Sequence, residues 1–212
     1  MLFRSASIGW IGGVRMPFQP MLASTNARRP LAGEWVLEPK FDGWRIIVAI
    51  DGEVRVWTRR GHDLTERLPE LAPLADLIGT PVVLDGELVA GQGRASDFYG
   101  VLGRVGARHR RAPLTFVAFD VLAFDGPVID QPYRHRRALL DGLALNGDAW
   151  CTTPQLHGRV VDALAACREH DVEGIVAIRV DSPYRPGERS GDWLKLKTAD
   201  WRTLHAPRRH EQ

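Results

Sequence analysis

The sequence predicts a fold of the α+β class, in which antiparallel hairpins combine with packing helices. Two short runs rich in β-branched and aromatic residues, 44–51 and 53–58, are joined by Asp51-Gly52, which is a strong hairpin signal. Strands and helices then follow one another without the regular alternation of a doubly wound parallel sheet. The chain has 212 residues, 44% of them hydrophobic, and no linker-like segment divides its middle. We therefore expect one domain with a sizeable hydrophobic core.

Each remaining element is predicted from its local pattern. Short apolar runs bounded by turn residues indicate five further strands, over 35–40, 81–91, 114–126, 172–180 and 192–197. A helical face with prolines near its turns predicts a helix over 64–79, with leucines at 64, 68, 71, 74 and 77. A short helix is expected over 95–105, where Ser96 or Asp97 is a suitable N-cap. Amphipathic patterns predict two surface helices, over 131–145 and 158–171.

Composition excludes several classes of protein. The formal charge of +2 is nearly balanced, so bulk charge does not indicate a nucleic-acid binder and only local clustering could. Cys151 and Cys167 have no metal-ligand or redox spacing, and we interpret both as small hydrophobic residues in a reducing compartment. No apolar run approaches the ~20 residues that span a bilayer, so no membrane partner is expected.

The two ends of the chain are expected to lie outside the domain. We expect residues 1–15 to be a disordered leader, with Met16 an equally good start, and residues 201–212 to be a tail. The expected location is cytoplasmic.

The segment EPKFDGWR, residues 38–45, sets a lysine between a proline and an aromatic residue and follows it with Asp42-Gly43. A lysine with the ordinary pKa of ~10.4 is rarely a nucleophile, but neighbouring cations and burial activate it. Arg45 follows closely, and Lys195 and Lys197 could converge on Lys40 from another strand. Asp42-Gly43 supplies a tight turn and a carboxylate for a metal ion or a hydroxyl group. The alternative is an exposed strand lysine before a hairpin turn.

Further motifs give this segment a context. After K-x-D-G-x-R at 40–45 come T-R-R-G at 58–61, L-D-G-E-L at 84–88, F-D at 119–120, E-G-I-V at 173–176 and W-L-K-L-K at 193–197. In these motifs and their order the chain resembles the nucleotidyltransferase (adenylation) domain of ATP-dependent DNA ligases, over residues 16–198. PFQPMLA at 17–23 and SPYRPGERSGDWLKLK at 182–197 are similar in detail to the ligase domains of bacterial end-joining systems.

The resemblance implies a covalent nucleotidyltransferase (ATP-grasp-like) fold over residues 16–200, with two antiparallel sheets flanked by helices and a nucleotide groove between them. It implies that Lys40 attacks the α-phosphate of ATP and forms a lysyl-AMP phosphoramidate. The AMP then passes to the 5′-phosphate of nicked or broken double-stranded DNA, and a 3′-hydroxyl closes the phosphodiester bond. Such a ligase acts in DNA repair or recombination, and a monomer is expected.

The resemblance also implies roles for individual residues. The catalytic set that it implies comprises Lys40, Asp42, Arg45, Lys195 and Lys197. Lys195 and Lys197 would hold the α-phosphate from the side opposite Lys40, in keeping with the charge neutralisation that phosphoryl transfer requires. Without the resemblance, their alternation with Leu194 and Leu196 describes an ordinary half-exposed strand.

The nucleotide itself would be bound by residues from several motifs. Phe119 would stack on adenine, although a phenylalanine in an apolar strand is more often core, and Glu38 would accept a hydrogen bond from the exocyclic amine. Glu87 and Glu173 are hard oxygen ligands suited to Mg²⁺ (or Mn²⁺) or to ribose hydroxyls, although Glu87 is also typical of a turn. Phosphate or ribose contacts are expected from three arginines: Arg45, Arg59 and Arg189.

A basic segment, RVGARHRRAP at 104–113, falls in a predicted loop. Its arginines could track the phosphates of DNA, although a basic loop is often only solvated. The predicted DNA-binding residues are Arg104, Arg108, Arg110 and Arg111.

Two departures from the family pattern leave alternatives open. Ile178 stands where many of these ligases have a lysine. The chain also ends about fifteen residues after the last motif, so we expect the OB-fold domain to be absent from it. The chain is then a fragment whose missing segment supplies that domain, a naturally minimal protein, or a protein whose partner supplies the OB-fold. The alternatives are an RNA ligase or capping-type nucleotidyltransferase, and a catalytically weak module that binds ATP or DNA.

Overall fold

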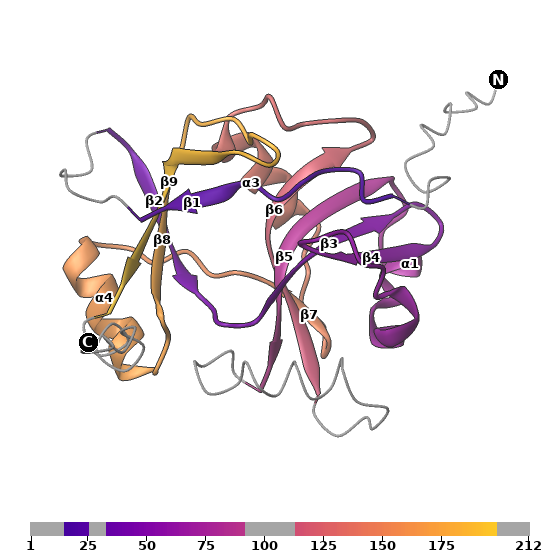
Figure 1. The fold of residues 1–212 in the computed structure, drawn as a ribbon, viewed down its shortest axis with the longest axis horizontal. Coiled ribbons are helices and arrows are strands. Elements are labelled where there is room, and N and C mark those ends of the chain that lie inside the picture. The colour runs from indigo at the N-terminus through magenta and orange to yellow at the C-terminus, as the bar shows by residue number, and fades with distance from the viewer. Residues whose placement is uncertain (1–14, 26–32, 92–112, 199–212) are drawn as a thin grey trace, which may run out of the picture.

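Two β-sheets stand side by side in the computed structural model, which describes residues 15–25, 33–91 and 113–198 (Figure 1). The first sheet has the strand order β1-β9-β8-β2. Its strands are β1 (Leu22–Ser24), β9 (Arg189–Lys197), β8 (Gly174–Arg179) and β2 (Trp35–Lys40). The second sheet has the order β4-β3-β5-β6-β7. Its strands are β4 (Val54–Thr58), β3 (Trp44–Ile50), β5 (Val82–Ala90), β6 (Leu114–Phe124) and β7 (Trp150–Thr152).

The seven predicted strands and the α+β class are confirmed, but each sheet is mixed rather than purely antiparallel. β1 pairs in parallel with β9, and β7 pairs in parallel with β6. Neither short strand was predicted, because three residues carry no alternating pattern and their partners lie far away in the sequence. The hairpin at Asp51-Gly52 is confirmed by the antiparallel pairing of β3 with β4.

The predicted helix over 64–79 is wrong as one continuous element. The segment forms two 3₁₀ turns, η1 (Thr65–Arg67) and η2 (Pro69–Leu71), and then the single α-helical turn α1 (Leu74–Leu77). Pro69 and Pro73 explain the breaks, because each lacks a backbone N–H and restricts the preceding residue. Burial follows the predicted face except at Leu77, which is 53% exposed; the buried leucines are Leu64, Leu68, Leu71 and Leu74.

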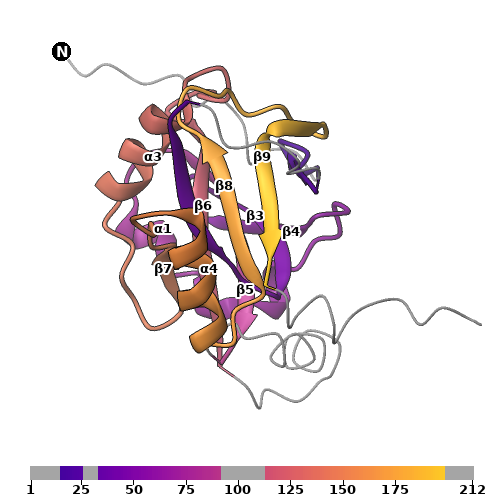
Figure 2. The same ribbon diagram turned by 90° about the vertical axis from the view of Figure 1, so that its left-hand side faces the viewer.

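Two helices, α3 (Tyr133–Gly142) and α4 (Val160–Glu169), confirm the two predictions made for that half of the chain. In Figure 2, α4 lies in front of the first sheet, where Ala163 and Cys167 join a core cluster with Ile175 of β8. The surface prediction is wrong for α3, because Arg136 and Arg137 are buried. Within the described ranges, no helix is long and apolar enough to cross a membrane. The predicted helix over 95–105 lies outside the described residues.

A cluster of buried side chains joins the two sheets. It includes Ile47 of β3 and Trp193 of β9, together with Tyr184 from the loop before β9. The Tyr184 hydroxyl accepts a hydrogen bond from the backbone N–H of Met21 at 2.8 Å and donates one to Asp85 Oδ2 at 2.6 Å. Apolar burial and these polar contacts therefore fix the position of one sheet relative to the other.

A fully buried ion pair secures α3 to β6. Arg136 Nε and Nη2 lie 2.8 and 2.9 Å from the two oxygens of Asp120, and both side chains have no exposed surface. Arg136 Nη1 also donates to the carbonyl oxygens of Gln131 and Ser182, at 2.6 and 3.0 Å. The guanidinium group therefore ties the helix, the sheet and the loop before β9 together.

Replacing Asp120 with alanine is expected to lower the free energy of unfolding by about 3–5 kcal/mol, because the guanidinium of Arg136 is left buried without its counter-ion. Urea unfolding followed by circular dichroism at pH 7 measures the change. The control is Asp162→Ala, which breaks the exposed Arg159–Asp162 pair on α4 and should leave the unfolding curve in place. Equal shifts in the two variants would contradict the expectation.

Candidate active site

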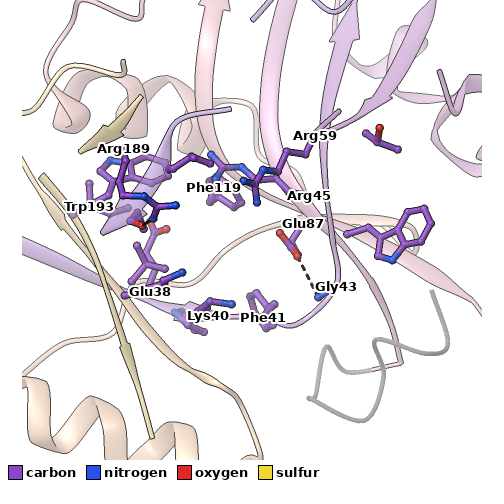
Figure 3. A pocket seen from close by; sticks show the side chains of 18 of the residues that line it. Glu38, Lys40, Phe41, Gly43, Arg45, Arg59, Glu87, Phe119, Arg189 and Trp193 are labelled. Atoms are coloured by element: carbon purple, nitrogen blue, oxygen red, sulfur yellow. Dashed lines mark hydrogen bonds between the residues drawn. The ribbon is translucent and has the colours of Figure 1, made fainter. Parts of the chain in front are cut away.

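A cavity of about 860 Å³ lies between the sheets, and we refer to it as the groove. Figure 3 shows Glu38 and Lys40 on one side and Arg45 and Glu87 on the other, with Phe119 between them. Eight of the ten predicted nucleotide-binding residues line it: Glu38, Lys40, Arg45, Arg59, Glu87, Phe119, Arg189 and Lys195. Residues of most of the motifs therefore lie around one cavity, and their role in binding a nucleotide stays a prediction.

The two remaining predicted residues, Glu173 and Lys197, lie directly beside Lys40. Lys40 is the last residue of β2, and its register partner on β8 is Gly174, the residue after Glu173. The Lys40 ammonium donates to Glu173 Oε2, and Lys197 Nζ lies 2.6 Å from Glu173 Oε1. Glu173 is 2% exposed, whereas the two lysine side chains are 24% and 25% exposed. A buried carboxylate thus holds two partly exposed amines together.

The chain contains only three lysines, and all three gather at this place. Of the 28 lysine and arginine residues, only Lys40, Lys195 and Lys197 are lysines. Burial lowers the pKa of Lys195, and the charges of Lys40, Lys197 and Arg189 lower it further. A cluster of cations suits a phosphate ligand, and an amine can lose its proton where a guanidinium cannot.

The glycines that follow the charged motif residues are explained by the close approach of neighbouring strands. A Cβ atom at Gly43 would lie 2.3 Å from the carbonyl oxygen of Leu88, and one at Gly174 would lie 2.1 Å from that of Leu196. Without a side chain, Gly43 also brings its N–H within 3.1 Å of Glu87 Oε1 (Figure 3). Burial raises the pKa of Glu87 to about 7, against the lowering effect of Lys40 and Arg45.

Arg45 forms part of the groove wall and is anchored by a residue that was not predicted. Its Nε and Nη2 donate to Asp85 Oδ1 and Oδ2 at 2.9 and 2.6 Å. Its guanidinium carbon lies 5.1 Å from the centroid of the Phe119 ring and 5.6 Å from that of Trp193. Two of its three nitrogen atoms are thus committed to the protein. Asp85 belongs to the L-D-G-E-L motif, which could have indicated it.

The opposite wall contains a second buried network, centred on Glu38. Glu38 Oε1 accepts hydrogen bonds from the Tyr133 hydroxyl and, at 2.8 Å, from Arg137 Nη1. Burial raises the pKa of Glu38 to about 8, against the lowering effect of Tyr133 and Arg137. Phe119 meets Trp193 edge to face, with 6.0 Å between ring centroids, and is only partly buried. Phe119 both lines the groove and packs against the inter-sheet cluster, so its stacking role stays a prediction.

Other predicted residues lie elsewhere. Asp42 does not line the groove, and the basic segment at 104–113 falls largely outside the described residues, including all four of its arginines. Ile178, which replaces a lysine of the family pattern, is buried in the groove wall opposite Trp193. Among the described residues, no group of three or more histidine, cysteine or acidic side chains is placed to hold a metal ion. The metal role of Glu87 and Glu173 therefore stays a prediction.

The family model described as the ATP dependent DNA ligase domain matches residues 20–197. The chain belongs to this family. Its sequence is 40% identical to the multifunctional non-homologous end joining DNA repair protein LigD of Mycobacterium tuberculosis over 190 residues, which cover 87% of this chain and 24% of LigD. It is 33% identical over 186 residues to the SPbeta prophage-derived DNA ligase-like protein LigB of Bacillus subtilis, covering 86% of this chain and 68% of LigB.

Solved structures agree with the family assignment. The ligase domain of M. tuberculosis LigD superposes with a TM-score of 0.73 at 36% identity, covering 85% of this chain and 60% of that one. Mycobacterial DNA ligase D complexed with ATP and MES superposes with a TM-score of 0.71 at 37% identity, with the same coverage. The chain is thus an ATP-dependent DNA ligase domain similar to the ligase domain of LigD, and it spans about a quarter of the length of the LigD proteins that it matches.

Proposed function

We propose that this ligase domain transfers AMP from ATP to Lys40 and then to the 5′-phosphate of nicked or broken DNA. The observation that supports this proposal best is the convergence of all three lysines at or beside the groove, two of them paired with one buried carboxylate. A solved relative, mycobacterial DNA ligase D, is complexed with ATP, which supports the same substrate here.

In the first step the neutral amine of Lys40 attacks the α-phosphorus of ATP. The new N–P bond forms as the bond from phosphorus to the bridging oxygen of pyrophosphate breaks, and the nitrogen loses a proton. In the second step an oxygen of the DNA 5′-phosphate attacks the same phosphorus and releases Lys40. In the third step the 3′-hydroxyl attacks the activated 5′-phosphate, loses its proton and releases AMP.

Different residues at the groove would contact the phosphates, the base and the ribose of ATP. Lys195 and Lys197 neutralise charge on the transferring phosphate, which is the main task of a protein in phosphoryl transfer. Phe119 stacks on the base, and Glu38 accepts a hydrogen bond from its amino group. Glu87 accepts a hydrogen bond from the ribose or, as the alternative, ligates a metal ion. Three arginines add phosphate or ribose contacts: Arg59, Arg189 and the remaining nitrogen of Arg45.

We propose that Mg²⁺ (or Mn²⁺) accompanies ATP, held by Glu173 and Glu87 together with phosphate oxygens. Carboxylate oxygens are ligands that Mg²⁺ prefers, and Mg²⁺ usually takes only one or two carboxylates from the protein. Both oxygens of Glu173 are bonded to lysines, so a metal ion bound directly to Glu173 would take the place of Lys40 or Lys197. When bound, the ion would neutralise charge on the phosphates.

Incubation with α-labelled ATP and Mg²⁺ tests the proposal. We expect an acid-labile label on the protein that is removed by pyrophosphate and passes to the 5′-phosphate of nicked DNA. Failure to label the protein would contradict adenylation. Faster transfer to nicked RNA than to nicked DNA would instead favour an RNA ligase.

A further inference from the structure

The carboxylate of Glu38 is held from one side only. Its side chain is 3% exposed and lines the groove. Glu38 lies on β2 two residues before Lys40, so the two side chains share one face of the strand. Both hydrogen bonds that Glu38 accepts within the described part of the chain, from Tyr133 and from Arg137, fall on Oε1. Oε2 is therefore the oxygen left for a ligand in the groove.

The two donors on α3 are themselves held in place. Each nitrogen of the Arg137 guanidinium has a separate acceptor: Nε donates to Asp141 Oδ1 at 2.9 Å, Nη1 to Glu38 Oε1 at 2.8 Å and Nη2 to the carbonyl oxygen of Thr153 at 2.9 Å. The Tyr133 side chain has no exposed surface, packs in the inter-sheet cluster, and has the guanidinium carbon of Arg136 5.8 Å from its ring centroid. Neither donor can turn away without losing other contacts, so both fix which carboxylate oxygen faces α3.

We propose that Tyr133 and Arg137 are positioning residues that set the preference of the groove for 6-amino over 6-oxo purine nucleotides. They act by presenting Oε2 of Glu38 to the base. An ionised carboxylate oxygen is an acceptor only, so it satisfies a 6-amino group and opposes a 6-oxo group. The inference rests on the proposed function, because it takes ATP as the nucleotide and Glu38 as the residue that contacts its base.

The sharpest test is Glu38→Gln. Because Tyr133 and Arg137 both donate, they require an acceptor, and the amide oxygen must take the place of Oε1. The amide NH₂ then occupies the place of Oε2 and presents a donor to the base. We expect the ATP-to-GTP ratio of second-order rate constants for labelling Lys40 to fall about 100-fold, because one nucleotide loses a hydrogen bond and the other gains one.

Removing either hydrogen-bond donor to Glu38 should also lower the ATP-to-GTP ratio. Tyr133→Phe and Arg137→Met each remove one hydrogen bond to Glu38 Oε1. We expect the ATP-to-GTP ratio of labelling rate constants to fall about 10-fold in each variant. The control is Tyr184→Phe, which removes another buried tyrosine hydroxyl from the inter-sheet cluster but leaves Glu38 untouched. It should lower stability and leave the ratio unchanged. All assays are run at about pH 9, above the pKa of Glu38, so that its carboxylate is ionised.

An unchanged ratio in the folded Tyr133→Phe and Arg137→Met variants, or a Glu38→Gln variant that keeps its ATP preference, would overturn the inference. A purely structural role would slow labelling by both nucleotides equally. If the unmodified chain forms no adduct with ATP, the proposed function fails on its own. Equilibrium binding of AMP and GMP to the same variants then decides the inference, with the same ratios expected.

Discussion

Replacing Lys40 with arginine will abolish the AMP adduct, with a loss of labelling of ~10⁴-fold or more. Arginine keeps the positive charge beside Glu173 but does not deprotonate at usable pH, so the nucleophile is lost while the ion pair is preserved. Intact-protein mass spectrometry after incubation with ATP and Mg²⁺ measures the adduct, and peptide mapping should place it on Lys40 in the unmodified chain.

Lys195→Arg is the matched control for this experiment. It replaces a lysine of the same groove without removing the proposed nucleophile, so the adduct should form more slowly but still form. An adduct that persists in Lys40→Arg at the unmodified rate would rule out Lys40 as the nucleophile and turn attention to the other two lysines.

The second large effect is expected at Glu173. Glu173→Ala removes the shared partner of Lys40 and Lys197, and with it the predicted metal ligand. We expect adenylation to fall by about 10²–10³-fold, the usual cost of losing one preorganised electrostatic group. Circular dichroism should show an unchanged fold, because the strands on either side keep their backbone hydrogen bonds.

Two further variants accompany Glu173→Ala: one tests the same charge cluster and the other is a control. Lys197→Ala removes positive charge from the same cluster and should slow the same step. Glu169→Ala, at the exposed end of α4, removes a carboxylate that does not line the groove and should leave the rate unchanged. Near-normal adduct formation in both Glu173→Ala and Lys197→Ala would mean that the groove has been wrongly assigned.

The fold was predictable from the sequence where local patterns decide the structure. In the described part of the chain, alternating and continuous apolar runs located every strand longer than three residues. The helix over 64–79 could not be predicted correctly from its leucines alone, because Pro69 and Pro73 interrupt the backbone hydrogen bonds while the leucines still pack. β1 and β7 depend on partners that are distant in sequence, and no local pattern reveals such a pairing.

In the candidate site, too, some residues could be predicted from the sequence and others could not. The residues that face the groove were predictable because they sit in motifs with fixed spacing. The residues behind them were not, because arginines on α3 have the local pattern of a solvated helix face. Arg137 is buried only because Glu38 approaches from β2, and Arg136 only because Asp120 approaches from β6. The burial of a charged side chain can be predicted only when its ion-pair partner is known, and tertiary structure decides which residue that partner is.

The scarcity of lysine has a practical consequence for handling the protein. Apart from the N-terminus, amine-directed reagents such as succinimidyl esters can react only with Lys40, Lys195 and Lys197, all at or beside the groove. Fluorescent labelling or surface coupling through amines would therefore act as active-site modification and be slowed by bound nucleotide. Coupling through Cys151, which is only partly buried, would leave these amines untouched.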